Sequence, residues 1–320
     1  MPALVLDDVS KRYGAFQAVR DLSFQVEPGT ICGFLGPNGA GKTSTIRMML
    51  GLQPASSGRI EILGADDGRK VRDRIGFLPE ERGVYKKMTP VDTIAFFAGL
   101  KGVPTGEGRK RARALLDAHG LGASKTKKMK ALSKGMAQKV QLLASIAHQP
   151  EFVILDEPFS GLDPVNQQGL EQIIRDLAAG GATVLFSTHV MQHAERLCDK
   201  VVLLARGQKA FEGTVTEARA RSTRFLELEG ALEQAAVAAL PGVASVDAVG
   251  EGEGGAKFRA ALAPGAEAQA ALRSAFISGL DVRRFEMREP TLHDAFIDLT
   301  GDDPDQDQRQ TEIRAEEAAR

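Results

Sequence analysis

The segment Gly36–Thr43 reads Gly-Pro-Asn-Gly-Ala-Gly-Lys-Thr and fits the pattern G-x-x-x-x-G-K-[ST]. Glycines at these positions let the backbone wrap around a phosphate chain and offer it several N–H groups. In such loops the lysine, here Lys42, reaches the β- and γ-phosphates, and the hydroxyl of Thr43 can bind Mg²⁺. The sequence therefore predicts a site for ATP and Mg²⁺ formed by Gly36, Pro37, Asn38, Gly39, Ala40, Gly41, Lys42, Thr43 and Ser44.

A second chemical feature lies at the end of the apolar run 152–155, where two carboxylates follow directly as Asp156 and Glu157. A buried strand seldom ends this way for packing alone. Beside a phosphate-binding loop, the first acid is expected to hold Mg²⁺. The second is placed to orient or deprotonate an attacking water. We therefore expect Thr43 and Asp156 to be metal ligands, and Lys42 and Glu157 to be catalytic.

Apolar strands alternating with amphipathic helices must position these groups. This alternation predicts an α/β layer with a mostly parallel sheet. The first thirty residues differ, because Leu4–Asp8 and Phe16–Val26 look like antiparallel strands that pair beside the main sheet, and residues 87–150 look like a helical lobe. The expected strands are 30–35, 75–78, 152–155, 183–187 and 200–205, and the expected helices are 42–51, 90–99, 107–119, 134–149 and 166–179.

A second domain is expected after residue 213, where the composition turns polar and basic over a linker at 214–224. The pattern then restarts in the order strand, helix, strand, strand, helix, strand between 225 and 287, with one more helix at 291–299. This order predicts a small α+β, ferredoxin-like domain at 225–300. The residues 301–320 carry many Asp and Glu and are expected to form an acidic, flexible tail.

The composition excludes several classes of protein. The chain has 320 residues, of which 43% are hydrophobic and 26% charged, as in ordinary soluble globular proteins. Its 41 Lys+Arg and 42 Asp+Glu give a net charge of −1, which disfavours a nucleic-acid binder that relies on bulk positive charge. Two cysteines exclude a disulfide framework. The apolar runs fall short of the roughly 20 residues that a membrane span needs.

Further motifs resemble the ATP-binding cassette (ABC) proteins and follow the order found in that family. Leu132-Ser133-Lys134-Gly135-Met136 resembles the signature motif, and Ser160-Gly161-Leu162-Asp163 resembles the D-loop. His189 is similar to the switch histidine, and Tyr13 to the aromatic residue that stacks on adenine. The resemblance covers about residues 3–213 and implies a P-loop ATPase fold with an antiparallel β subdomain and a helical lobe, hence an ABC ATP-binding domain at 1–213.

This resemblance implies a head-to-tail dimer that sandwiches two ATP molecules. Ser133 and Gly135 of one subunit would contact the γ-phosphate of the ATP on the other subunit's P-loop. His189, a further catalytic residue, would contact the γ-phosphate and help to position the attacking water near Glu157, and Asp163 would couple the two sites. The family's Q-loop glutamine is replaced by Glu80, which would keep a contact to nucleotide and metal but adds a charge.

The stretch 76–85, the Ser-Lys-Gly-Met signature and the segment 289–301 together resemble a subgroup of bacterial ABC exporters, similar to the sodium-extrusion and drug-resistance systems. This implies an ATPase that drives a separately encoded membrane permease, paired with an identical or related subunit, on the inner face of the cell membrane. The surface after Glu80 would receive the permease.

Alternative functions remain open at this point. One is a soluble ABC ATPase that acts on nucleic acid or protein assembly, although the chain has one P-loop and no sustained heptads. Another is a switch regulated by a ligand of the second domain. A zinc site at His189 and His193 lacks a third ligand and the glutamate of a protease motif. The lysines at 125, 127, 128 and 130 fit a solvated loop, with lipid headgroups or the permease as lesser alternatives.

Overall fold

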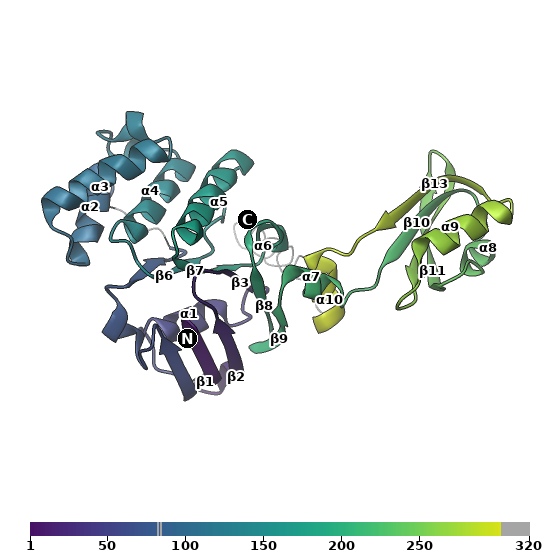
Figure 1. Cartoon of the computed structure of the whole chain (residues 1–320), viewed down its shortest axis with the longest axis horizontal. Coiled ribbons are helices and arrows are strands. Elements are labelled where there is room, and N and C mark those ends of the chain that lie inside the picture. Colours follow the sequence, from purple (N-terminus) through teal and green to yellow (C-terminus); the bar gives the residue numbers. More distant parts are fainter. Residues whose placement is uncertain (82, 84, 302–320) are drawn as a thin grey trace, which may run out of the picture. The chain divides into compact units, whose positions relative to one another are not determined.

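A computed structural model describes residues 1–81, 83 and 85–301 (Figure 1). The chain divides into two compact units, Met1–Val215 and, from Thr216 onward, the rest of the described chain. The predicted acidic tail at 301–320 falls outside the described residues except for Gly301. None of the helices in the described part of the chain combines the length and the apolar character that crossing a bilayer requires.

The first unit is built around a six-stranded sheet with the order β5-β6-β7-β3-β8-β9. All neighbouring strands are parallel except β9, which pairs antiparallel with β8. Every residue of the three central strands β6, β7 and β3 is buried, as expected for a sheet covered on both faces. The strands are β3 (Ile31–Leu35), β5 (Ile75–Leu78), β6 (Phe152–Asp156), β7 (Thr183–Thr188), β8 (Lys200–Ala205) and β9 (Gln208–Gly213).

The register of this sheet brings three functional segments to one edge. Leu35 of β3 pairs with Thr188 of β7, and Asp156 of β6 pairs with Ser187 of β7. The carboxyl ends of these three strands therefore meet, as is usual for binding sites in parallel sheets. The phosphate-loop motif follows β3, the paired acids lie at the end of β6, and His189 follows β7.

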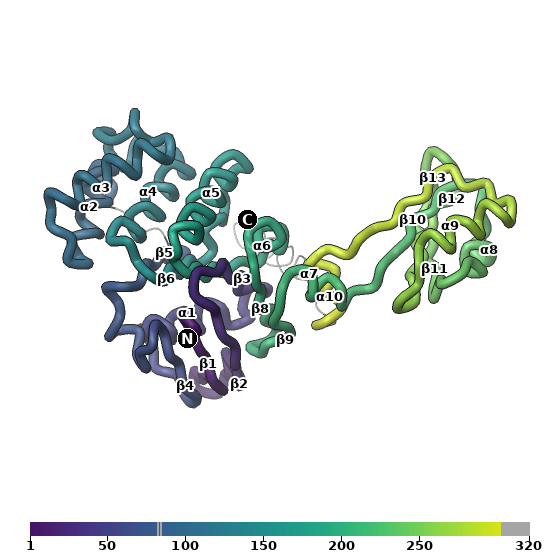
Figure 2. Tube along the Cα trace, in the orientation of Figure 1, coloured from purple at the N-terminus to yellow at the C-terminus, as the bar shows by residue number. Residues whose placement is uncertain are grey.

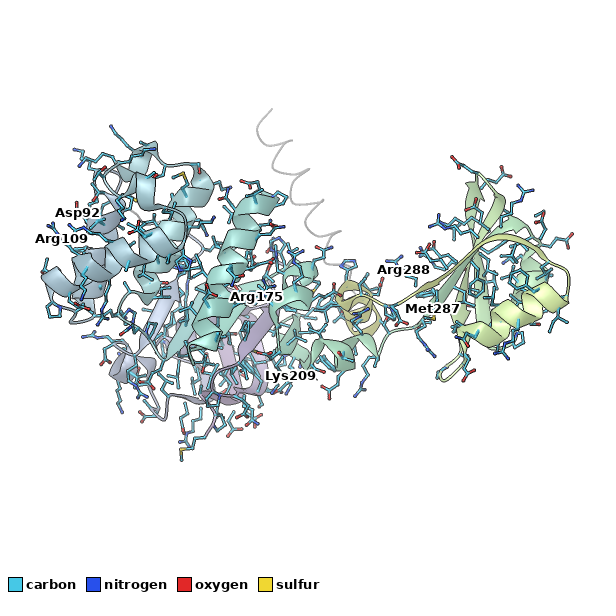
Figure 3. All side chains as sticks on the ribbon, turned by 45° about the horizontal axis from the view of Figure 1, so that its top comes forward. Asp92, Arg109, Arg175, Lys209, Met287 and Arg288 are labelled. Atoms are coloured by element: carbon cyan, nitrogen blue, oxygen red, sulfur yellow. The ribbon has the colours of Figure 1, made fainter. Side chains whose placement is uncertain are left out.

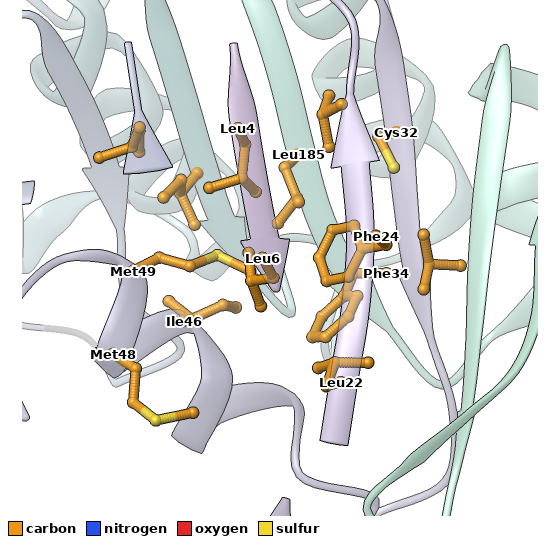
Figure 4. Packing of buried hydrophobic residues seen from close by; sticks show 14 of the residues in the cluster. Leu4, Leu6, Leu22, Phe24, Cys32, Phe34, Ile46, Met48, Met49 and Leu185 are labelled. Atoms are coloured by element: carbon orange, nitrogen blue, oxygen red, sulfur yellow. The ribbon is translucent and has the colours of Figure 1, made fainter. Parts of the chain in front are cut away.

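An antiparallel sheet with the order β2-β1-β4 packs against the main sheet; it consists of β1 (Leu4–Tyr13), β2 (Phe16–Val26) and β4 (Ser57–Ile62). The sequence predicted its first two strands beside the main sheet, but β1 pairs with β2 on one edge and β4 on the other, so they form a separate sheet. Figure 4 shows the core between the sheets, where Phe24 stacks on Phe34 at 5.4 Å and helix α1 (Lys42–Met49) contributes Ile46 and Met49. This buried apolar surface fixes α1 and the loop before it.

The helical lobe predicted at 87–150 contains three packed α-helices and two short 3₁₀ turns (Figure 1). Thr89 begins its first helix, since its hydroxyl accepts a hydrogen bond from the Asp92 N–H and Pro90 occupies the first turn. The lobe elements are α2 (Pro90–Leu100), α3 (Thr105–Ala118), η2 (Gly122–Ser124), η3 (Met129–Ala131) and α4 (Lys134–Ile146). Two further helices of the first unit are α5 (Pro164–Ala179) and α6 (Met191–Leu197), and a 3₁₀ turn, η1 (Gly68–Val71), precedes β5.

The second unit contains a four-stranded antiparallel sheet with the order β11-β12-β10-β13, and Figure 2 shows the path of its chain. A strand-helix-strand-strand-helix-strand order with this arrangement is the ferredoxin-like topology predicted from the sequence. Leu226 and Leu228 of β10 are buried with α8 and α9 residues in a separate core. The elements are β10 (Phe225–Ala231), α8 (Gln234–Ala238), β11 (Val243–Gly252), β12 (Gly255–Leu262), α9 (Ala268–Ile277), β13 (Asp281–Arg288) and α10 (Leu292–Thr300).

Some short elements carry too weak a pattern to be read from the sequence. They are β4, β9, α6 and α7 (Val215–Arg219), and the last of these lies inside the segment expected as a linker at 214–224. Helix α7 has five residues and buries only Ala218, so it has little apolar periodicity. A hydrogen bond from the Ser222 hydroxyl to Asp298 joins the chain after α7 to helix α10.

Candidate active site

The loop between β3 and α1 depends on glycines for its path. A side chain at Gly36 would place its Cβ 2.4 Å from the carbonyl oxygen of Leu204, and one at Gly41 would meet the carbonyl oxygen of Ala18 at 2.6 Å. Gly41 also has φ of 100°, in the left-handed region, and it occupies the N-cap of α1. Because glycine has no side chain to cap the helix, the first N–H groups of α1 are left for a ligand, and the helix dipole favours an anion there.

Lys42 begins helix α1 and folds back over the loop. Its Nζ donates hydrogen bonds to the carbonyl oxygens of Gly36 at 2.6 Å and Pro37 at 3.1 Å, and it lies 3.4 Å from Glu157 Oε1. Only 6% of the residue is exposed. Burial lowers the pKa of Lys42, and the carboxylates of Glu157 and Asp156 oppose that shift. A buried ammonium held by two carbonyls and a carboxylate is a suitable partner for a phosphate.

Asp156 and Glu157 are both buried at the end of β6, and Ser187 on β7 holds them. The Ser187 hydroxyl donates to Asp156 Oδ1 at 2.5 Å and accepts from the Glu157 N–H at 3.1 Å. Burial raises the pKa of Asp156, and hydrogen bonds from the Ser187 and Thr43 hydroxyls oppose the shift. Glu157 has φ of 47°, a conformation that strains a non-glycine residue and is typical of functional positions. Ser187 was missed by the sequence analysis, because a serine inside an apolar strand has no distinctive pattern.

His189 lies just after β7 and contacts the second acid. Its Nδ1 is 3.1 Å from Glu157 Oε1, so the imidazole and the ammonium of Lys42 approach the same carboxylate oxygen. The tertiary structure therefore brings together Lys42 at the start of α1, Glu157 just after β6 and His189 just after β7.

A cavity of about 420 Å³ opens beside Lys42 and Glu157, a size within the range of small-molecule sites. Tyr13 lies on its wall, and the Tyr13 hydroxyl donates to the side-chain oxygen of Gln53, a residue that the sequence analysis missed. The residue Tyr13 is 42% exposed, and the Lys11 ammonium lies 5.1 Å from the centre of its ring. The lining residues are Tyr13, Phe16, Ala18, Pro37, Asn38, Gly39, Gly41, Lys42, Thr43, Ser44, Glu80 and Glu157.

Glu80 adds a third carboxylate near this cavity. Its pKa is raised by partial burial and by the neighbouring charges of Asp156 and Glu157, while Lys42 and His189 oppose the shift. The site therefore holds more negative charge than it would with a glutamine at this position.

The oxygen donors in and beside the cavity fit Mg²⁺. Thr43 and Glu80 line the cavity, and Asp156 lies behind them in hydrogen-bond contact with the Thr43 hydroxyl. They supply one hydroxyl and two carboxylates, the hard oxygen donors that this ion prefers. Within residues 1–81, 83 and 85–301, no three His, Cys, Asp or Glu side chains are arranged to hold a metal by themselves.

The zinc alternative is not supported by the geometry. His193 stacks on Phe159 at 4.2 Å, and its Nδ1 lies 3.0 Å from an Arg196 nitrogen and 3.5 Å from Glu171. A histidine bonded to an arginine in this way is part of the packing of α6 rather than a ligand shared with His189.

Ser133, Gly135 and Asp163 form a second group that does not line the cavity. Ser133 caps α4, since its hydroxyl accepts from the Met136 N–H at 3.3 Å. Asp163 caps α5, and its carboxylate accepts from the N–H and the side-chain amide of Asn166 at 3.0 and 2.5 Å. A side chain at Gly135 would meet the Asn166 amide at 2.2 Å, so the two helix N-termini are close together. Within one chain, these residues do not reach the phosphate loop's cavity.

Comparisons with known proteins agree with this architecture. Residues 19–160 match the ABC transporter family, and residues 213–300 match the C-terminal domain of proteins like the ATP-binding proteins DrrA1-3. The chain is 35% identical over 312 residues to the ABC transporter ATP-binding protein YhaQ of Bacillus subtilis, covering 93% of this chain and 98% of that protein. It is also similar to two resistance proteins. One is the daunorubicin resistance ATP-binding protein DrrA3 of Streptomyces coeruleorubidus, at 35% identity over 94% of this chain and 96% of that protein. The other is the linearmycin resistance ATP-binding protein LnrL of Bacillus subtilis, at 30% identity over 93% of this chain and 98% of that protein.

The first unit also resembles solved structures. The structure of an ATP-binding subunit of an ABC transporter matches 68% of this chain and 92% of its own length, with 33% identity and a TM-score of 0.62.

Proposed function

The chain belongs to the ATP-binding subunits of ABC transporters, and from this membership we propose that it is the motor of an exporter, driving a separate membrane permease by hydrolysing MgATP. The observation that carries the chemistry is the contact of Glu157 with both Lys42 and His189 at the sheet edge where β3, β6 and β7 end. The function of the related proteins DrrA3 and LnrL, named for drug resistance, supports an exporter.

Each residue has a role in the proposed reaction that follows from its position. The N–H groups of the loop 36–43 and the start of α1 bind the phosphates, and the Lys42 ammonium exchanges its two carbonyl partners for phosphate oxygens. Tyr13 stacks on the base. Thr43, Asp156 and Glu80 would hold Mg²⁺, which would neutralise phosphate charge when bound. The Glu157 carboxylate accepts a proton from the attacking water, and His189 keeps that carboxylate in position.

The second group acts across a dimer in this proposal. Ser133 and Gly135 lie at the N-terminus of α4, where the helix dipole favours an anion, yet their own chain's cavity is lined by other residues. A head-to-tail partner, identical or related, would bring them to the γ-phosphate on the partner's loop. Asp163, next to Asn166 and Gly135, is then placed to connect the two sites.

The partners and the location follow from the exporter role. We propose that the permease is a separate chain that docks beside Glu80, and that this chain lies against the inner face of the cell membrane. The relatives named above carry transporter or resistance names, so the soluble alternative has no observation in its favour.

A trapping experiment tests this proposal. In Glu157→Gln, the phosphate contacts remain but the base is lost, so MgATP should convert the purified chain from monomer to a stable dimer on size-exclusion chromatography. Lys42→Ala is the control, since it removes the phosphate contact and should neither bind nor dimerise. Rapid hydrolysis by Glu157→Gln, or tight MgATP binding by Lys42→Ala, would contradict the assigned roles.

The exporter role is tested with the same trapped variant. Tagged Glu157→Gln with MgATP, incubated with detergent-solubilised native membranes, should capture a polytopic membrane protein. Capture of soluble protein or nucleic acid alone would leave the ATPase in place and refute the exporter.

A further inference from the structure

Two lysine-containing segments that are far apart in the sequence lie together in the helical lobe. The N–H of Met129 donates to the carbonyl oxygen of Met88 at 2.9 Å, and the N–H of Lys130 donates to that of Lys86 at 3.2 Å. These bonds join the chain before α2 to η3. The two joined segments carry five exposed lysines, which we call the lysine patch: Lys86, Lys87, Lys127, Lys128 and Lys130.

The patch has a fixed scaffold rather than a loose loop. Met129, in the middle of the second segment, is only 3% exposed and anchors η3 in the lobe. The preceding turn is closed by a hydrogen bond from the Lys127 N–H to the carbonyl oxygen of Ser124 at 3.1 Å. The backbone is therefore held inside while the lysine side chains point to solvent.

The carboxylates of the lobe do not neutralise the patch. Asp92 pairs with Arg109 at 3.0 Å, and both residues are labelled in Figure 3. Asp117 pairs with Lys125, the lysine of the same run that is excluded from the patch. Among the residues that the structure describes, none of the five patch lysines forms an ion pair. Five like charges held together on a chain of net charge −1 repel one another, so the arrangement favours an anionic partner.

Aromatic side chains lie next to the patch. Tyr85, directly before Lys86, is 56% exposed and makes an edge-to-face contact with Phe96, which is 40% exposed, with ring centroids 5.6 Å apart. Exposed aromatic rings beside lysines are the combination that proteins place at membrane surfaces, where rings enter the headgroup layer and ammonium groups meet phosphates.

We propose that the lysine patch binds anionic phospholipid headgroups of the membrane surface, giving the chain a lipid contact besides its permease. The patch contains lysines and no arginine, and lysine acts as a point charge that suits a fluid layer of phosphates, whereas arginine is preferred for fixed bidentate contacts with protein carboxylates or nucleic acid. The inference rests on the proposed function insofar as that function brings the chain to a membrane.

Vesicle flotation of the full-length chain, without permease, tests the inference. The chain should float with vesicles of phosphatidylcholine mixed with phosphatidylglycerol, not with phosphatidylcholine alone, and added salt should release it. Lys127→Gln with Lys128→Gln should lower the partition coefficient about 25-fold, since each lysine near an anionic surface contributes about fivefold. Lys127→Arg with Lys128→Arg keeps the charge and should bind like wild type.

A matched control removes the same charge elsewhere. Arg20→Gln with Arg59→Gln changes two exposed residues of the antiparallel sheet and should leave flotation unchanged. The inference is overturned if wild type shows no preference for phosphatidylglycerol, or if the control loses as much binding as the patch variant. A third outcome also overturns it: wild type does not bind vesicles, and the patch substitutions abolish capture of the membrane protein from solubilised membranes. The patch would then be a protein interface. Dimer trapping does not depend on these lysines, so failure here leaves the ATPase mechanism intact.

Discussion

Ser187 is a sensitive test of how the active site is built, because it supports both acids at once. In Ser187→Ala, Asp156 Oδ1 loses the hydroxyl that donates to it at 2.5 Å, and the Glu157 N–H loses its acceptor at 3.1 Å. Ser187 is fully buried and both acids are nearly so, which means that water cannot easily replace the missing partner.

The expected cost follows from these two bonds. A hydrogen bond to a charged group is worth about 1.5–3 kcal/mol, and a neutral one about 0.5–1.5 kcal/mol. Ser187→Ala should therefore lower the free energy of unfolding of the first unit by about 2–4 kcal/mol. The left-handed backbone of Glu157 costs about 1–3 kcal/mol, so without Ser187 its carboxylate should leave the reactive position more often. ATP hydrolysis should fall at least about tenfold, equivalent to about 1.4 kcal/mol.

Urea unfolding followed by far-UV circular dichroism measures the first effect. The transition of the first unit is identified as the one that MgATP shifts, because a ligand stabilises only the unit that binds it. Steady-state ATP hydrolysis measures the second effect. Ser145→Ala is the matched control, since the Ser145 hydroxyl only donates to the carbonyl oxygen of Leu142 within α4 at 2.8 Å. It should change the free energy of unfolding by less than about 0.5 kcal/mol.

The reasoning is refuted if Ser187→Ala unfolds within about 0.5 kcal/mol of wild type, the range of ordinary surface substitutions. If Ser187→Ala loses the predicted free energy of unfolding but hydrolyses ATP at the wild-type rate, only the predicted effect on hydrolysis is refuted. That result would show that Glu157 keeps its position without the serine.

The remaining predictions concern two titratable groups. Burial lowers the pKa of His148 to about 4 from 6.5, with Lys101 adding to the shift, while its contact with the carbonyl oxygen of Ile75 opposes it. Below pH 6.5 the unfolded chain takes up this proton first, so the free energy of unfolding should decline from pH 6.5 toward about 4. Urea unfolding across this pH range should show that the free energy of unfolding declines less steeply in His148→Gln than in wild type. Equal declines in the two proteins would contradict the lowered pKa of His148. Glu80→Gln removes a charge that repels phosphate beside Glu157. Titration with a fluorescent ATP analogue in the absence of Mg²⁺ should therefore show about fivefold tighter binding, whereas weaker binding would argue against such repulsion.

The sequence by itself determined the chemistry and the order of the main elements. The loop motif 36–43 and the acids Asp156 and Glu157 have fixed spacing relative to a strand and a helix, and such local patterns survive in any fold that uses them. The long buried strands and amphipathic helices were also predicted, because their periodicity extends over enough residues to be distinct. Most strands of the main sheet and the four strands of the second unit's sheet were therefore predicted from local patterns, whereas β4 and β9 were not.

Only the tertiary structure decided which residues meet. Sheet order is set by long-range packing rather than by local pattern, so the pairing of β7 with both β3 and β6 places Ser187 and His189 against the acids of a different strand. Short elements such as α6 and α7 depend on contacts with distant residues and leave little periodicity in the sequence. The lysine patch also required the structure, since the backbone bonds between Lys86–Met88 and Met129–Lys130 join segments about forty residues apart.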